Sequence, residues 1–183
     1  MIVKLETLTS MSEFKDVDDS TLQRKLNSVE QLIRAYTNNN FQNRAVRFEA
    51  ASYGAELTAD DKYAAVFPFL KQGDTVEISQ STANVNDGLY VVKTVNPDSI
   101  TVDCDLFTVD YNLVTKVVYP EDVQEGVINL LQWEVENRQK VGIKQETLSR
   151  HSVTYFDQDA SNQVMGYPVA LLGFLSPYIK ARF

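Results

Sequence analysis

Apolar side chains that recur every three or four residues predict an amphipathic helix over residues 18 to 36. The run Asp18–Ser20 supplies N-cap residues, because a side-chain oxygen there can accept a hydrogen bond from a free backbone N–H of the first turn. The run Asn38–Asn40 ends this helix. A similar repeat over residues 5 to 14 predicts a shorter helix, antiparallel to the long one.

A second long helix is predicted from Pro120 to about Gln139. Proline suits the first helical position, and Gly142 supplies the stop. Acidic residues stand at its beginning and basic residues near its end, as the helix dipole favours. Its apolar stripe is widened by Ile128 and Trp133, which predicts burial on more than one side.

Between these helices, residues 46 to 118 are rich in Val, Thr, Tyr and Ile and alternate between apolar and polar positions. The pattern predicts a small twisted sheet or barrel. Val76 and Ile78 are expected to face its interior, and Asn86–Gly88 and Asn96–Asp98 are expected to form turns.

The fold class expected from these patterns is α+β. A small helical core, residues 1–45 and 119–183, is interrupted by a β-rich module, residues 46–118. The two ends of the module, at Arg44–Ala45 and Tyr119–Pro120, should lie close together so that the helices they join can still pack.

After Gly142 the chain is polar and reads as a long loop with a strand near residues 151–156. Pro168 then opens a short helix that Pro177 ends. Apolar and polar side chains alternate over residues 178–183, which predicts a terminal strand. Such a strand must pair with a distant strand of its own fold or with the sheet edge of another chain.

The chain has 183 residues, enough for one compact domain or for one domain with a smaller one attached, and a formal net charge of −8. Its longest apolar runs, such as Pro168–Leu175, are far shorter than the roughly 20 residues of a membrane span. The N-terminus lacks the pattern of a secretory signal, so synthesis in the cytoplasm is expected.

Charge is unevenly distributed along the chain. Residues 46–118 carry five basic and eleven acidic side chains, which accounts for −6 of the −8. This acidity is either a solvated face or a surface that repels DNA, and it argues against tight nucleic-acid binding, which depends on neutralising phosphates.

Few residues offer catalytic or metal chemistry. Cys104 and His151 are each the single residue of their type, which excludes disulfides within the chain and any metal site needing several cysteines or two imidazoles. Asp103 and Asp105 disfavour the Cys104 thiolate, so a buried or idle thiol is expected. The start of Asp157–Asn162 resembles a calcium loop but lacks its glycine and its closing glutamate. The sequence therefore predicts no catalytic residue, no cofactor and no metal.

Several segments of the two helical parts resemble one protein family. They are Leu130–Trp133 within the second long helix, Ser149–Phe156, and above all Gly166–Pro168 followed by Leu172–Phe183. Together these segments resemble the head-tail connector (adaptor) proteins of long-tailed bacteriophages. Within the β-rich module, Gly73–Val76 is more weakly similar to small β-modules of phage structural proteins.

The resemblance implies a non-enzymatic protein of the virion neck. About a dozen copies would form a ring on the portal protein, extend the channel through which double-stranded DNA passes regardless of its sequence, and offer a platform to a stopper or next neck protein. The residues expected to dock on the portal are Pro177, Tyr178, Ile179, Lys180, Ala181, Arg182 and Phe183. The residues expected to contact the channel or a neighbouring subunit are Lys144, Arg150, His151 and Tyr155.

Two other classes of function remain open. In one, the β-rich module binds a carbohydrate or cell-surface ligand, which exposed aromatic side chains on the module would favour. In the other, the protein is an enzyme whose site gathers acidic residues around His151.

Overall fold

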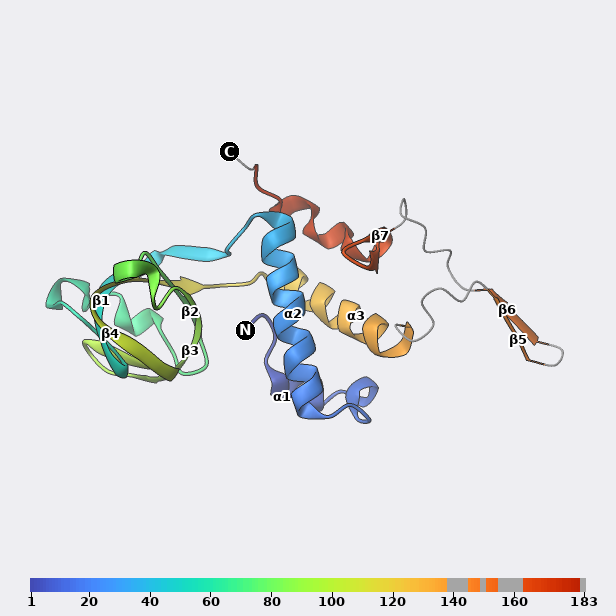
Figure 1. The fold of residues 1–183 in the computed structure, drawn as a ribbon, viewed down its shortest axis with the longest axis horizontal. Coiled ribbons are helices and arrows are strands. Elements are labelled where there is room, and N and C mark those ends of the chain that lie inside the picture. The colour runs from blue at the N-terminus through green and yellow to red at the C-terminus, as the bar shows by residue number, and fades with distance from the viewer. Residues whose placement is uncertain (138–144, 149–150, 155–162, 182–183) are drawn as a thin grey trace. The chain divides into compact units, whose positions relative to one another are not determined.

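A computed structural model describes residues 1–137, 145–148, 151–154 and 163–181. The chain divides into two units, which Figure 1 shows together and which are described separately below. Met1 and residues 40–119 form the β unit, and residues 2–39 and 120–183 form the helical unit. Helices and an antiparallel sheet together make the chain an α+β protein.

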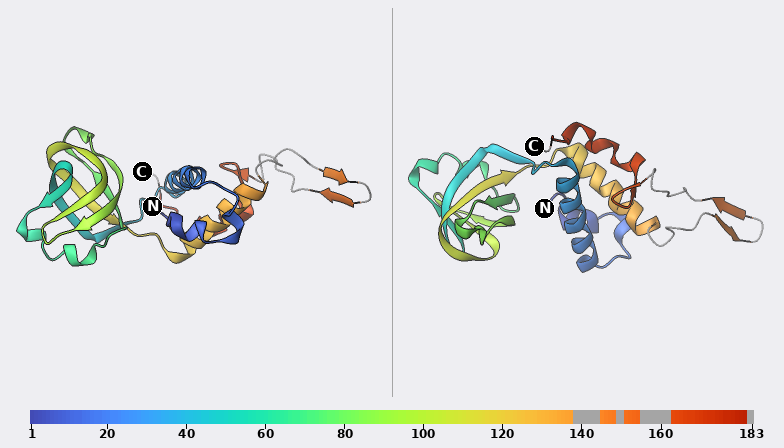
Figure 2. Two further views of the ribbon diagram at one scale, coloured as in Figure 1. Left: turned by 90° about the horizontal axis from the view of Figure 1, so that it is seen from below. Right: turned by 45° about the horizontal axis from the view of Figure 1, so that its top comes forward.

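The β unit is built on one curled antiparallel sheet. Its strands are β1 (Gln42–Ala59), β2 (Thr75–Ser79), β3 (Gly88–Val95) and β4 (Ser99–Val117). Short 3-10 turns lie between them at η2 (Asp61–Tyr63), η3 (Phe67–Phe69) and η4 (Thr82–Asn84). The beginning of β4 pairs with β3, its end pairs with β2, and β1 follows it along most of its length. The sheet therefore curls around its own interior, as Figure 2 shows.

The interior of the β unit is apolar, as alternation predicted. Val76 and Ile78 are both buried, so their expected orientation is confirmed. The rings of Phe48 and Phe67 lie 5.1 Å apart in the same core. The pairing between β1 and β4 shifts register at several points, one of them at Gly54, whose φ of 56° favours glycine. Such bulges allow two long strands to bend.

The two ends of the β unit lie side by side. Gln42 is paired with Val117, and the backbone N–H of Val118 donates to the carbonyl of Phe41 at 2.9 Å. The rings of Phe41 and Tyr119 are 4.9 Å apart. The first strand therefore starts before residue 46. Apolar alternation misses this start because the leading residues of β1 are polar and not buried.

A buried polar cluster holds the bend between β1 and β4. The Asn86 amide donates to the Phe107 carbonyl at 2.9 Å and to the side chain of Asn112 at 3.1 Å. Its own carbonyl accepts from the Phe107 N–H at 2.9 Å. Ser52 Oγ donates to the Phe107 carbonyl at 2.7 Å. All three polar side chains are buried, and their partners compensate for the cost of removing them from water.

The helical unit contains more elements, most of them short. Its helices are α1 (Leu5–Thr9), η1 (Ser12–Phe14), α2 (Asp19–Thr37), α3 (Glu121–Asn137) and the 3-10 helix η6 (Val169–Tyr178). Its strands are β5 (Gln145–Leu148), β6 (His151–Thr154), β7 (Gln163–Val164) and β8 (Tyr167–Pro168). The pairs β5–β6 and β7–β8 each form a two-stranded antiparallel sheet.

The helix predicted over residues 18 to 36 is confirmed as α2. The Asp18 carboxylate accepts from the Thr21 N–H at 2.9 Å, and Asn38 ends the helix in the left-handed region with φ 48°. The single helix predicted over residues 5 to 14 is wrong, because α1 ends at Thr9 and a 3-10 turn follows. The side chains of Thr9 and Ser10 donate to backbone carbonyls three residues earlier, which competes with regular helix.

The second long helix is confirmed as α3, starting directly after Pro120, while its predicted end near Gln139 and the stop at Gly142 lie outside the described residues. Its buried residues are Val123, Gly126, Val127, Ile128, Leu130 and Leu131. The helix contacts α2 and η1 as well as η6, so the predicted burial on more than one side is also confirmed.

The C-terminal region departs from its prediction in two ways. The helix after Pro168 is a 3-10 helix that includes Pro177 and ends at Tyr178. Tyr178 belongs to η6 and residues 179–181 are in no strand, so the strand predicted over residues 178–183 does not pair within the described part of this chain, and its pairing with another chain stays a prediction. Upstream, the strand predicted near residues 151–156 is present as β6, which pairs with β5.

Candidate docking site

Residues 178–181 are tied to the end of α2. The backbone N–H of Lys180 donates to the Thr37 carbonyl at 2.7 Å. The side-chain amide of Asn38 donates to the Ala181 carbonyl at 2.9 Å, and that of Asn39 donates to the Tyr178 carbonyl at 3.2 Å. Asparagine suits this place because it tolerates the left-handed conformation that ends a helix and also carries an amide donor. These three bonds form the amide latch.

The amide latch explains why this segment forms no strand. A strand needs its backbone N–H and C=O groups for a neighbouring strand, but here several of them are bonded to α2. The Tyr178 hydroxyl is also engaged, because it lies 2.8 Å from each carboxylate oxygen of Asp122. This hydrogen bond, followed by partial burial and the charge of Asp122, raises the pKa of Tyr178.

The latched segment points much of its side-chain surface outward. Ile179 is 49% exposed, and Pro177, Lys180 and Ala181 are exposed as well. The segment is therefore held mainly through its backbone while its side chains remain accessible. Of the predicted docking residues, Arg182 and Phe183 lie outside the described residues.

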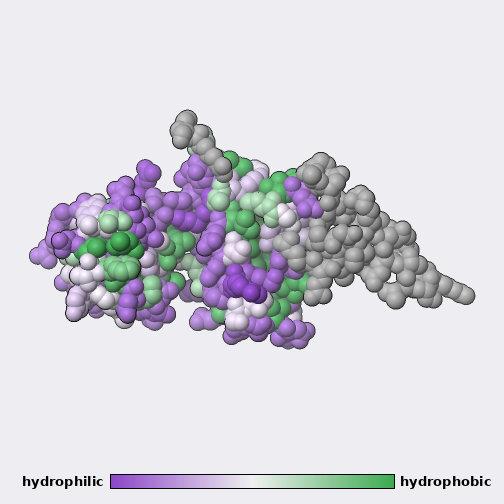
Figure 3. Space-filling model, viewed as in Figure 1, coloured by the Kyte–Doolittle hydropathy of each residue, from purple (hydrophilic) through white to green (hydrophobic). Residues whose placement is uncertain are grey.

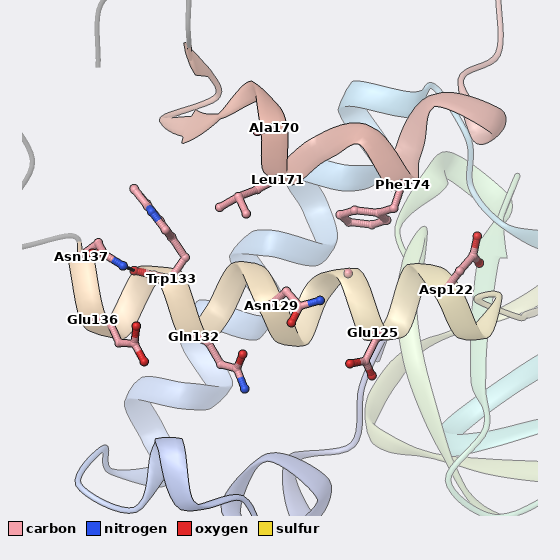
Figure 4. Close-up of a pocket in the computed structure, with 11 residues that line it drawn as sticks. Asp122, Glu125, Asn129, Gln132, Trp133, Glu136, Asn137, Ala170, Leu171 and Phe174 are labelled. Carbon is pink, nitrogen blue, oxygen red and sulfur yellow. Dashed lines mark hydrogen bonds between the residues drawn. The ribbon is translucent and has the colours of Figure 1, made fainter. Parts of the chain in front are cut away.

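A groove of about 620 Å³ runs between α3 and η6 in the same unit. In Figure 4, Leu171 and Phe174 project from η6 toward α3, and Trp133 projects from α3 toward η6. The carboxylates lining the groove belong to Asp122, Glu125 and Glu136. Its lining residues include no Lys or Arg, so the groove combines an apolar floor with a negative rim.

Close contact between α3 and η6 depends on a glycine. A Cβ atom added at Gly126 would lie 2.5 Å from the ring of Phe174, closer than side chains can approach. The absence of a side chain at Gly126 therefore lets the Phe174 ring rest directly on α3 and shapes one end of the groove.

Of the four expected channel or subunit residues, only His151 lies within the described residues. Lys144, Arg150 and Tyr155 lie outside the described residues. His151 is the first residue of β6 and is paired with Leu148, and only its backbone is described. The contacts expected of these four residues remain predictions.

Cys104 is exposed, so of the two expected states, a buried or an idle thiol, the buried one is wrong. Residual burial and the neighbouring charges of Asp103 and Asp105 raise the pKa of its thiol, which disfavours the thiolate as expected. Within the described ranges, no cluster of three or more His, Cys, Asp or Glu side chains is arranged to hold a metal ion. The calcium-like segment Asp157–Asn162 lies outside those ranges. No helix in the described part of the chain has the length and apolarity of a membrane span.

Sequence reasoning missed the residues that organise this region. The Asn38–Asn40 run predicts only a helix end, but the amides of Asn38 and Asn39 also bond to the backbone of residues 178–181. The pairing of Asp122 with Tyr178 joins residues 56 positions apart, and no local pattern indicates it. The same holds for the contact between Gly126 and Phe174.

No known protein family, curated protein or solved structure matches this sequence.

Proposed function

We propose that this protein is a non-enzymatic head-tail connector of a bacteriophage neck. Made in the host cytoplasm, it docks on the portal as a homo-oligomeric ring of about a dozen copies and becomes part of the virion. The ring extends the DNA channel and provides the platform for the stopper and tail. The resemblance of the C-terminal run to the connector family motivates this assignment.

The observation that carries the proposal is the state of the C-terminal segment. It pairs with no strand within the described part of the chain, it keeps exposed side chains such as Ile179, and a few hydrogen bonds hold its backbone. Breaking the amide latch would cost about 3 kcal/mol, at about 1 kcal/mol for each bond. Adding residues 177–183 as a strand to a portal sheet edge would form comparable backbone bonds and offset that cost.

The acidity of residues 46–118 is compatible with this role. A channel through which DNA must slide needs a surface that does not hold phosphates, since each attractive contact would have to be broken during ejection. In this proposal, Lys144, Arg150, His151 and Tyr155 contact the channel or the neighbouring subunit.

Removal of residues 179–183 tests the docking role while leaving η6 intact. The truncated and full-length proteins are each mixed with the purified portal protein of the same genome, and the products are imaged by electron microscopy. Full-length protein should form a ring on the portal, and the truncated protein should not.

Far-UV circular dichroism of the truncated protein should match that of the full-length chain, and Lys15→Ala, an exposed change on the helical unit, should dock normally. Docking by the truncated protein would refute the role assigned to the segment. Failure of the full-length protein to bind the portal would refute the function itself.

One observation favours the carbohydrate-binding alternative. Tyr53 is 79% exposed and Phe107 is 68% exposed, and they stand on paired stretches of β1 and β4 beside the buried Asn86 cluster. Exposed aromatic faces on a rigid bend are suited to stacking against sugar rings. Glycan-array binding that is lost in Tyr53→Ala and retained in Tyr111→Ala would support this alternative, and an array without hits would reject it.

A further inference from the structure

The 3-10 helix η6 is unusually apolar for a surface element. Its sequence from Val169 to Tyr178 contains no charged residue, yet only Leu172 and Leu175 are buried within it. Val169 is 47% exposed, and Leu171 and Phe174 are partly exposed. Figure 3 shows apolar surface over the part of the molecule where Figure 1 draws η6. A helix that is apolar on all sides is normally covered, so the outer face of η6 indicates an interaction surface.

The groove beside η6 is acidic, so a segment that covers this surface should carry positive charge. Asp122, Glu125 and Glu136 line it without a compensating cation among the lining residues. A segment that fills the groove must therefore have apolar side chains that pack on Trp133 and Phe174, and positive charges that pair with the carboxylates of the rim.

The chain itself contains one segment with that composition. Residues 138–156 carry Arg138, Lys140, Lys144 and Arg150 but only one acidic residue, Glu146, in a protein that is otherwise strongly acidic. The same segment also contains the apolar residues Val141, Ile143, Leu148, Val153 and Phe156. Residues 138–156 are named the basic arm.

The described part of the basic arm is a ribbon of two strands. β5 and β6 pair with each other, and no third strand joins them within the described residues. An isolated two-stranded ribbon is at best marginally stable in water, so it gains stability by packing on another surface.

We infer that the groove between α3 and η6 of one copy binds the basic arm of a second copy. The apolar side chains of the arm cover η6, and its cations approach the carboxylates of Asp122, Glu125 and Glu136. This inference deepens the proposed function, since it rests on the assembly of a ring and names the contact between neighbouring subunits. A contact from the arm of one copy to the groove of the next is heterologous, and such contacts generate rings when the rotation closes.

Cross-linking between two distinguishable variants tests this contact in the full chain without portal or DNA. Both carry Cys104→Ser. One, with a size tag, also carries Asn129→Cys in the groove, and the other carries Ser152→Cys in the arm. The two are mixed with a short bismaleimide and separated on a denaturing gel. The control replaces Asn129→Cys by Ser28→Cys, at an exposed α2 position outside the groove lining. The yield of tagged heterodimer with Asn129→Cys should be at least ten times the yield with this control.

Charge reversal separates this contact from random collision. Glu125→Lys with Glu136→Lys should lower the heterodimer yield severalfold, and Lys144→Glu with Arg150→Glu in the arm variant should restore it. Glu6→Lys, an exposed reversal elsewhere in the unit, should leave the yield unchanged. A heterodimer yield equal to that of Ser28→Cys, or insensitive to the paired reversals, would overturn the inference.

A chain carrying both cysteines identifies the owner of the arm. Cross-linked products of dimer size and larger support exchange between copies, whereas a cross-linked monomer alone would show that each groove holds its own arm and would refute the inference. A synthetic peptide of residues 138–156 adds a second measurement, because it contains no tryptophan and Trp133 is the only one in the chain. The peptide should shift the Trp133 emission of the wild-type protein, and less so in the Glu125→Lys, Glu136→Lys variant.

The two proposals fail separately. Loss of portal docking with arm-to-groove cross-links intact would reject the neck function and keep the subunit contact. Portal docking without those cross-links would keep the function and reject the contact.

Discussion

In the β unit, the strand β4 pairs with all three other strands, and the sheet closes around its own core. In the helical unit, by contrast, η6 covers α3 with one side and leaves apolar surface on the other. The buried polar atoms of Asn86, Ser52 and Asn112 are bonded to one another within the β unit. The C-terminal segment of the helical unit is instead held by the amide latch at the end of α2.

The β unit therefore has a fully covered core, whereas the helical unit leaves part of its apolar surface uncovered. The β unit satisfies its strands and polar groups internally, so its stability should depend on its own packing. The helical unit leaves an apolar helix face, an acidic groove and a latched terminus at its surface. We therefore expect substitutions in the β unit to affect mainly folding, and substitutions on the exposed parts of the helical unit to affect mainly assembly.

The largest effect is expected from Phe48→Ala. Phe48 is 1% exposed and packs against Phe67 in a core cluster made only of β-unit residues. Truncating a buried phenylalanine costs about 3–5 kcal/mol. Urea unfolding should show this loss in the far-UV signal of the sheet, while the Trp133 fluorescence transition, which reports on the helical unit, should stay near its wild-type midpoint. A shift of both transitions together would break the comparison.

A smaller loss, about 2–3 kcal/mol, is expected for Asn86→Ala. The substitution removes the bonds that Asn86 makes to Phe107, Ser52 and Asn112. Ser52 and Asn112 stay bonded to each other and the Phe107 carbonyl keeps its bond from Ser52, so the main cost is the Phe107 N–H that loses the Asn86 oxygen, and one such orphaned group costs about 1–3 kcal/mol. Thr82→Ala, an exposed position in the preceding turn, serves as the control and should change stability little. Equal stability of the two variants in urea unfolding would show that water replaces the lost partners.

For Gly126→Ala we expect a net loss of about 1 kcal/mol. Alanine gains up to about 1 kcal/mol of helix propensity, but its Cβ would overlap the Phe174 ring, and overpacking of this kind costs about 1–3 kcal/mol. The sign should reverse in a Phe174→Ala background, where only the propensity gain remains. A double-mutant cycle by thermal unfolding measures the coupling, and additive effects would contradict the contact.

The smallest effect is expected from acid titration of the α2 cap. Hydrogen bonds from Ser20 and then Thr21 lower the pKa of Asp18 to about 2 from its usual 3.8. A carboxylate with a lowered pKa stabilises the fold fully above the ordinary value and loses that contribution as pH falls through about 2. Asp18→Asn keeps a cap oxygen but does not titrate, so its helicity should decline less between pH 4 and 2. Identical acid curves by circular dichroism would exclude this role for Asp18.

Regular elements were predictable where a local pattern specifies them. The start of α2 at the Asp18 cap, its end at Asn38, the wide stripe of α3 and the inward-facing Val76 and Ile78 all follow from spacing within a few residues. The failures have equally local causes. Side chains of Thr9 and Ser10 compete for backbone carbonyls in the first helix, and the polar start of β1 carries no alternation.

The candidate docking site was predictable only in part. Alternation over residues 178–183 is a genuine feature of the sequence, and the resemblance singled out the same run. Its conformation was not predictable, because Thr37, Asn38 and Asn39 form hydrogen bonds with the backbone groups that a strand would need. The latch joins positions about 140 residues apart, and periodicity carries no information on such pairs.

The sequence by itself determined the two long helices and the β-rich character of the middle segment, where charge accumulates, and that cysteine and histidine are too few for most metal or disulfide chemistry. Those properties depend on neighbours within one or two turns of the chain. Only the tertiary structure decided that η6 keeps an uncovered apolar face, that acidic residues of α3 line a groove beside it, and that residues 178–181 are held at the end of α2. Each of these arises where distant segments meet, and packing rather than local preference selects the conformation there.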